Sequence, residues 1–176
     1  MKFLPCRLAG AFVVEIEPHQ DARGLFARTF CQDEFVRHGL PGQFVQCNIS
    51  RNRLRGTLRG MHYQIEPAPE GKLVRCTRGS IYDVLVDLRT DSPTYTQWEA
   101  FDLSAQTARA VFIPPGIAHG FQTLEDDTEV FYQMTEFYQP DLQRGVRWDD
   151  PAFRIRWPLE TVAVSERDNS YPDFCG

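Results

Sequence analysis

Short segments in which apolar and polar residues alternate dominate the chain, and this period-two pattern predicts a β-rich fold. Turn-forming sequences separate the segments, the clearest being PHQDARG, EPAPEG, RTDSPT and IPPG. One helix pattern spans residues 33–39, where Gly39 is placed to end the helix. The predicted strands span residues 12–17, 25–30, 43–50, 57–64, 72–78, 81–88, 98–103, 110–113, 120–124 and 130–135.

The number and spacing of these strands favour an all-β sandwich, jelly roll or barrel. A chain of 176 residues can bury its own core, and we expect a single domain over residues 1–176. From Pro140 onward the sequence is richer in Pro, Asp and Trp. We therefore expect an irregular C-terminal segment that folds back on the sheet.

The alternation within residues 81–88 raises a question about Asp83. In a strand, Asp83 shares one face with Ile81 and Leu85. A carboxylate buried on that face without a partner would be costly. We therefore expect a basic side chain or a histidine beside Asp83, unless this face contacts solvent.

Composition and charge narrow the function classes. Hydrophobic residues make up 42% and charged residues 24% of the chain, as in an ordinary globular protein. The formal net charge of -5 argues against a general binder of nucleic acid or of membrane surfaces, because both require a basic surface. Lys2 and Lys72 are the only lysines. The many arginines suit bidentate phosphate binding, although a G+C-rich genome would produce the same bias.

The cysteines indicate a reducing compartment, and we expect a cytoplasmic protein. Their number is odd, their spacing is wide and no C-x-x-C occurs, which argues against a disulfide framework and a zinc site. We expect Cys47 and Cys76, which lie in strand-like segments, to be buried. The N-terminal apolar segment is interrupted by Pro5 and Arg7, so it does not resemble a signal peptide, and no segment approaches transmembrane length.

Two of the four histidines lie in patterns of interest. His19 and His38 lie in a turn and at the end of the predicted helix, where we expect surface residues. His62 lies within the strand pattern RGTLRGMHYQ, and His119 follows the turn of IPPGIAHGF. Each is open to three interpretations: a hydrogen-bonded core residue, a metal ligand or a proton-transfer group.

The spacing around His62 and His119 resembles that of the cupin superfamily, whose metal-binding members usually carry a second histidine two residues after the first. Gln64 occupies that position here, and Glu66 precedes a proline-rich turn. Catalytic zinc and non-haem iron normally have three protein ligands. We therefore expect no metal site.

An ordered set of motifs covers almost the whole chain. It comprises DARGLFARTF, QCNISRNRLRGTLRGMHYQ, GKLVRCTRGSIYDVLVDLR, SPT, IPPGIAHGF, FYQMTEFYQP, RGVRWDDP, IRWP and SERD. Together these motifs resemble the dTDP-4-dehydrorhamnose 3,5-epimerase family. The resemblance implies a cupin jelly roll with a few short helices, a homodimer and no cofactor. It also implies a nucleotide-diphosphate sugar as the substrate, namely a 4-keto-6-deoxyhexose, with no nucleic-acid or membrane partner.

This chemistry is consistent with the residue types. A 4-keto group acidifies the hydrogens on both neighbouring carbons, so epimerisation needs a base on one face, an acid on the other and stabilisation of an enolate. By resemblance, His62 is the base, Asp168 pairs with it and Tyr132 is the acid. Lys72 lies near the enolate oxygen, and His119 lies near the sugar.

The resemblance also implies a set of binding residues. Arg23 and Arg59 are expected to contact the diphosphate, and Gln46 and Asn48 to contact the nucleotide. Tyr138 is expected to stack on the base and Arg167 to contact the substrate. Phe26 is expected to pack against the sugar, the nucleotide or the core. Arg28 and Gln143, also near the nucleotide, stand where the family commonly has glutamate.

These departures leave the substrate open between thymidine, cytidine and guanosine diphosphate sugars. The epimerised centre stays open between C3, C5 or both. Two function classes compete with the epimerase: a non-catalytic nucleotide-sugar-binding cupin and a metal-dependent cupin enzyme.

The stretch around Gly60 presents a geometrical conflict. Strict alternation places Leu58 and His62 on one face of the strand and Arg59 on the other, yet the resemblance gives Arg59 and His62 one ligand. We expect Gly60 to mark a bulge or a close backbone approach. Alternatively, Arg59 reaches around a sheet edge or serves a site shared with a second subunit.

Overall fold

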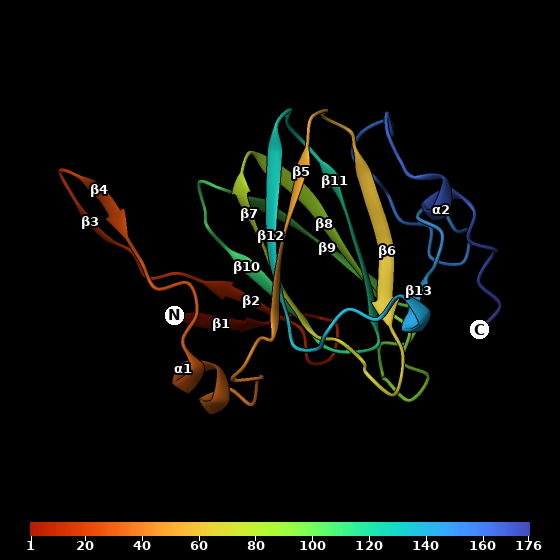
Figure 1. Cartoon of the computed structure of the whole chain (residues 1–176), viewed down its shortest axis with the longest axis horizontal. Coiled ribbons are helices and arrows are strands. Elements are labelled where there is room, and N and C mark those ends of the chain that lie inside the picture. Colours follow the sequence, from red (N-terminus) through yellow and green to blue (C-terminus); the bar gives the residue numbers. More distant parts are fainter.

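Two antiparallel sheets face each other in the computed structural model, which describes residues 1–176, and a small hairpin projects from them (Figure 1). The six-stranded sheet has the order β1 (Lys2–Pro5), β2 (Phe12–Glu15), β10 (Ala110–Ile113), β7 (Lys72–Arg78), β12 (Thr128–Met134) and β5 (Gln46–Asn52). The five-stranded sheet has the order β13 (Gln143–Gly145), β6 (Leu58–Gln64), β11 (Ile117–Thr123), β8 (Ser80–Asp87) and β9 (Trp98–Ser104). This arrangement confirms the predicted jelly roll.

Alternating side chains from both sheets form the main core. Val74 and Val130 come from the six-stranded sheet, and Ile81, Leu85 and Phe121 come from the five-stranded sheet. All of them are at most 4% exposed. The inward faces therefore follow the period-two pattern of the sequence.

The outer faces of the two sheets have separate covers. On the six-stranded sheet, Phe35 from helix α1 (Gln32–Arg37) packs with Leu73 and Phe112. On the five-stranded sheet, the C-terminal segment contributes Val146 and Phe153 to a second apolar cluster. This segment is mostly irregular, with the 3-10 helix η1 (Pro140–Leu142) and helix α2 (Glu166–Asn169), and it folds back on the sheet as predicted.

The projecting hairpin differs from its prediction. It consists of β3 (His19–Asp21) and β4 (Gly24–Phe26), all of whose residues are exposed. The sequence PHQDARG, predicted as a turn, therefore includes a strand. The strand predicted at residues 25–30 ends at Phe26, because the chain leaves the hairpin and places Phe30 against Phe35 and Phe44.

The bounds of the other strands agree with the predicted bounds to varying extents. β7 and β10 have the predicted bounds, whereas β11 begins three residues earlier than predicted. The pattern missed β1 and β13, which are too short to show clear alternation. The prediction that Cys47 is buried is wrong, because Cys47 is exposed on β5, an edge strand, whereas Cys76 is buried. No helix has the length and apolar character needed to cross a membrane.

Candidate active site

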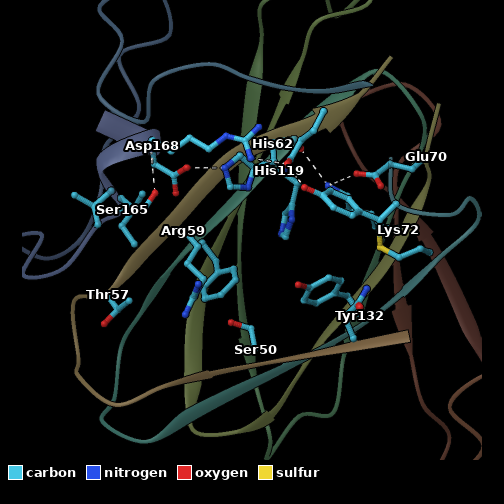
Figure 2. A pocket seen from close by; sticks show the side chains of 18 of the residues that line it. Ser50, Thr57, Arg59, His62, Glu70, Lys72, His119, Tyr132, Ser165 and Asp168 are labelled. Atoms are coloured by element: carbon cyan, nitrogen blue, oxygen red, sulfur yellow. Dashed lines mark hydrogen bonds and ion pairs between the residues drawn. The ribbon is translucent and has the colours of Figure 1, made fainter. Parts of the chain in front are cut away.

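A cavity of about 670 Å³ lies between the two sheets and collects most of the predicted site residues (Figure 2). Its walls come from β5 and β12 of one sheet and from β6 and β11 of the other. The loop after β12 and the segment around α2 complete it. The predicted residues on its lining are Gln46, Asn48, Arg59, His62, Lys72, His119, Tyr132, Tyr138, Gln143, Arg167 and Asp168.

A bulge in β6 lets Arg59 and His62 face the same cavity. Opposite them on β11, His119 pairs with His62 and Phe121 pairs with Arg59, so β6 has one residue more than β11 over this interval. Gly60 has a φ of 128°, and a Cβ atom there would collide with Gly120 Cα. These features confirm the predicted bulge and close approach at Gly60.

His62 and Asp168 form a closely bonded pair. His62 Nε2 lies 2.7 Å from Asp168 Oδ1, and the Gly60 N–H donates to Asp168 Oδ2 at 3.2 Å. Ser165 caps α2 by accepting from the Asp168 N–H, which fixes the position of the carboxylate. Burial alone would raise the pKa of the Asp168 carboxyl, but the His62 and Gly60 bonds hold it below its usual value. A carboxylate so placed orients the imidazole and stabilises its protonated form.

A second histidine–carboxylate pair lies deeper in the same sheet. His119 Nε2 is 2.7 Å from Asp83 Oδ1, and the Asp83 side chain is fully buried. The expectation of a basic or histidine partner for Asp83 is therefore confirmed, and the solvent-facing alternative is wrong. Both histidines use Nε2 for their carboxylates, which leaves Nδ1 as the second ring nitrogen of each.

Lys72 has a partner that sequence analysis did not identify. Its Nζ lies 2.8 Å from Glu70 Oε1 and donates to the His62 backbone oxygen at 3.1 Å. Both Glu70 and Lys72 are buried, and both line the cavity (Figure 2). Burial of an ammonium group is tolerable when a carboxylate neutralises it and hydrogen bonds satisfy it.

Tyr132 faces the histidines from the other sheet. Its strand, β12, belongs to the six-stranded sheet, whereas His62 lies on β6 of the five-stranded sheet. Figure 2 shows the Tyr132 ring across the cavity from His62. Burial raises the pKa of Tyr132, the charge of Glu70 adds to this effect and the charge of Arg59 opposes it. The hydroxyl therefore stays protonated at neutral pH.

A polar cluster forms one end of the cavity. The Gln143 Oε1 atom accepts from Tyr138 Oη at 2.8 Å and from Arg167 Nη1 at 2.7 Å. Gln46 Oε1 accepts from the Tyr138 N–H at 3.2 Å, and Gln46 Nε2 donates to Asn48 Oδ1 at 3.2 Å. Arginine beside an aromatic ring and amide groups can bind a nucleotide.

Gln64 lies in a supporting position. Its Nε2 atom donates to the Ala68 and Phe137 oxygens, and its Oε1 atom accepts from the Gln139 N–H. Gln64 thus holds the loop that carries Tyr138. No three side chains of His, Cys, Asp or Glu come together in a geometry that could hold a metal ion.

Arg23, Phe26 and Arg28 are not on the lining of the cavity within the single chain. Arg23 lies on the projecting hairpin and bonds to Asp21. Phe26 is 76% exposed, and Arg28 pairs with Glu34 at 3.0 Å. Their assignment to substrate binding stays a prediction.

Sequence reasoning also missed several lining residues besides Glu70. Two of them, Phe121 and Met134, follow from strand alternation, while Ser165 reaches the cavity through the fold of the C-terminal segment. The missed lining residues include Ser50, Thr57, Phe121, Met134 and Ser165.

Comparison with known proteins gives consistent matches. The family model described as dTDP-4-dehydrorhamnose 3,5-epimerase matches residues 5–175. The chain is 46% identical to the dTDP-4-dehydrorhamnose 3,5-epimerase of Methanothermobacter thermautotrophicus over 97% of this chain and 92% of that protein. Among solved structures, the dTDP-4-dehydrorhamnose 3,5-epimerase of Bacillus anthracis with TDP and PPi bound has a TM-score of 0.95 and 38% identity, covering 98% of this chain and 99% of that one. The RmlC of Legionella pneumophila in complex with dTDP-4-keto-L-rhamnose has a TM-score of 0.89 and 36% identity, covering 95% and 89%.

Proposed function

The chain belongs to the dTDP-4-dehydrorhamnose 3,5-epimerase family of isomerases, and from this membership we propose that it epimerises a nucleotide-linked 4-keto-6-deoxyhexose. The preferred substrate is dTDP-4-dehydro-6-deoxy-D-glucose, epimerised at C3, C5 or both, in the biosynthesis of rhamnose or a related deoxy sugar. One observation carries the proposal: His62, which is bonded to Asp168, faces Tyr132 across the cavity, and these two side chains come from different sheets.

The proposed reaction consists of two proton transfers. His62 takes the proton from a carbon beside the C4 ketone, and the electron pair of that C–H bond moves into an enolate whose charge rests on the C4 oxygen. Asp168 stabilises the imidazolium, and the Lys72 ammonium stabilises the enolate. Tyr132 then donates a proton to the same carbon from the opposite face, which inverts it. Proton exchange with solvent restores neutral His62 and the Tyr132 hydroxyl.

The substrate is neither oxidised nor reduced in these steps, so they need no hydride carrier, and the Lys72 ammonium supplies the positive charge that stabilises the enolate. The nucleotide occupies the polar end of the cavity, with Tyr138 against the base and Arg59 and Arg167 near the diphosphate. The Arg59 Nε atom already donates to Asn52 Oδ1 at 2.7 Å, which holds its guanidinium in place.

Free thiols on all five cysteines support a cytoplasmic location.

We also propose a homodimer in which the hairpin of one protomer reaches the cavity of the other. The Arg23 side chain is 90% exposed, and Leu25 and Phe26 are 57% and 76% exposed. Exposed apolar side chains on a projecting hairpin favour a protein interface. The edge strand β5 also carries an exposed apolar residue, Ile49, which is 58% exposed and could contact such a hairpin.

Proton NMR in D2O tests the activity. The protein is incubated with dTDP-4-keto-6-deoxyglucose, and then with its CDP and GDP counterparts, while deuterium uptake at C3 and C5 is followed. We expect uptake at one or both centres with the dTDP sugar. The His62→Ala variant should lose it, and Tyr132→Phe should reduce net inversion more than deprotonation. Absence of exchange with all three sugars would reject the proposal.

A further inference from the structure

Glu70 and Lys72 are adjacent in the cavity wall, but Glu70 lies in a loop and Lys72 lies in a strand. Lys72 is the first residue of β7, and its backbone pairs with Ile113 on one side and Met134 on the other. Glu70 lies in the loop before β7. The backbone of Lys72 is therefore fixed by the sheet, whereas its four-carbon side chain has many rotamers available.

The Lys72 ammonium has two protein contacts. Its Nζ donates a hydrogen bond to the His62 backbone oxygen and forms an ion pair with Glu70 Oε1 at 2.8 Å. The N–H groups that do not bond to His62 are available to a ligand in the cavity that Lys72 lines. The two protein contacts thus determine where the ammonium lies in the cavity wall.

We infer that Glu70 is a positioning residue, which aims the Lys72 ammonium at the C4 oxygen of the substrate and neutralises its charge while the cavity is empty. This inference rests on the proposed function. The role of Glu70 is exerted through Lys72. When negative charge develops on the C4 oxygen, the ammonium is already oriented, so no side-chain reorganisation is needed at that moment.

A purely structural role for the Glu70 carboxylate would be to hold its loop. The loop has other anchors, because the Gly71 N–H donates to Thr135 Oγ1 at 2.7 Å and the Thr135 N–H donates to the Gly71 oxygen at 2.9 Å. These bonds fix the backbone next to Glu70 without the carboxylate. The carboxylate itself has Lys72 as its ion-pair partner.

The first test observes the Lys72 side chain directly and needs no activity. The chain has only two lysines, Lys2 and Lys72, so protein labelled with 13C at lysine Cε gives two sets of ε-methylene signals in a 1H–13C spectrum. Lys2 is exposed and serves as the internal reference. In Glu70→Ala, we expect the Lys72 signal to shift and sharpen toward that of a mobile side chain, with Lys2 unchanged. An unchanged Lys72 signal would overturn the inference.

The second test separates binding from chemistry. In the D2O exchange assay, we expect Glu70→Ala to lower kcat about tenfold with KM within about twofold of wild type, because the aimed N–H acts on the enolate. Glu70→Gln keeps an acceptor for Lys72 and should recover part of this loss. Glu66→Ala, in the same loop but exposed, is the matched control and should behave as wild type.

A double variant shows whether Glu70 acts through Lys72. In the Lys72→Ala background, Glu70→Ala should cause no further loss of kcat. An equal loss in both backgrounds, or a change in KM alone, would overturn the inference. An inactive wild-type protein would instead reject the proposed function, and the Lys72 signals would still decide whether Glu70 positions the side chain.

Discussion

Arg59 and His62 lie three residues apart on β6, and both side chains line the same cavity. In a regular strand, residues three apart face opposite sides of the sheet. The extra residue at the bulge reverses the alternation between them, and the pairing of β6 with β11 shows where this happens. In the proposed function, one short segment therefore supplies both a cation for the diphosphate and a base for the sugar.

Replacing Gly60 should abolish the site. In Gly60→Ala, the new Cβ would collide with Gly120 Cα, and the φ of 128° is one that residues with a side chain rarely adopt. We expect a loss of at least about 3 kcal/mol in the free energy of unfolding, or failure to fold, together with loss of exchange activity. Gly24→Ala is the matched control, because Gly24 has a φ of 124° with nothing within 4 Å of the added Cβ. Equal destabilisation of both variants in thermal unfolding would contradict the role of the close approach.

Asp168→Asn should retain the fold but lose most of the activity. The amide cannot stabilise the His62 imidazolium as the carboxylate does, so we expect the exchange rate to fall on the order of 10²- to 10⁴-fold. The rate of deuterium uptake at saturating substrate measures this. Asp102→Asn, at an exposed position on β9, should leave the rate unchanged. A loss of less than about tenfold in Asp168→Asn would remove Asp168 from the proposed mechanism.

Asp87 should make stability dependent on pH in the acid range. It is fully buried, and its carboxylate accepts from Arg89, Ser92 and Thr94. Burial opposes ionisation, but these bonds prevail and lower the pKa of Asp87 to about 2 from the usual 3.8. A lowered pKa stabilises the folded state at pH values above about 4, and this contribution disappears as the pH falls toward 2.

The corresponding variant is Asp87→Asn, compared with wild type by urea unfolding between pH 7 and pH 2.5. From the size of the shift we expect a difference of about 2 kcal/mol at pH 7 that shrinks as the pH falls. Asp91→Asn, at an exposed position nearby, should show no such trend. A difference that does not change with pH would mean that the ionisation of Asp87 is not responsible.

Gln143→Ala should weaken nucleotide binding and spare the chemistry. Tyr138 and Arg167 would lose their shared acceptor, and two modest hydrogen bonds correspond to a Kd for dTDP about tenfold higher. Titration calorimetry with dTDP measures this, and kcat should stay within about twofold. Gln139→Ala, whose side chain is exposed, is the control. An unchanged Kd would show that the cluster does not contact the nucleotide.

Two inactive variants should restore activity when mixed, if the hairpin serves the neighbouring protomer. In Arg23→Ala, the base His62 is intact but the hairpin arginine is missing. In His62→Ala, the reverse holds. Within a mixed dimer, one cavity combines the intact His62 of one chain with the intact Arg23 of the other. Mixing with subunit exchange should recover about a quarter of the wild-type rate per chain, by random pairing. No recovery in a dimer with demonstrated exchange would place both residues in the same chain's site.

Local patterns determined much of this protein. Alternation identified β7 and β10 with their bounds and assigned Ile81, Asp83 and Leu85 to one face. The buried position of Asp83 required a partner, because an unpaired carboxylate in the core is costly. Gly60 lies between Arg59 and His62 and has no side chain, so it can allow a close backbone approach. Its position therefore predicted where the bulge lies.

The alternation of residues did not determine which partners meet, because period-two patterns define faces but not neighbours, and the pairing of His62 with Asp168 was expected only from the family resemblance. His62 and Asp168 are 106 residues apart in the chain and come together only when the C-terminal segment packs against β6. The same holds for His119 beside Asp83, and for Tyr132 facing His62 from the other sheet. Glu70 showed no pattern at all, since its role depends on where the Lys72 side chain ends. Residue types and their faces were local information, whereas the chemistry of the cavity required long-range packing to bring them together.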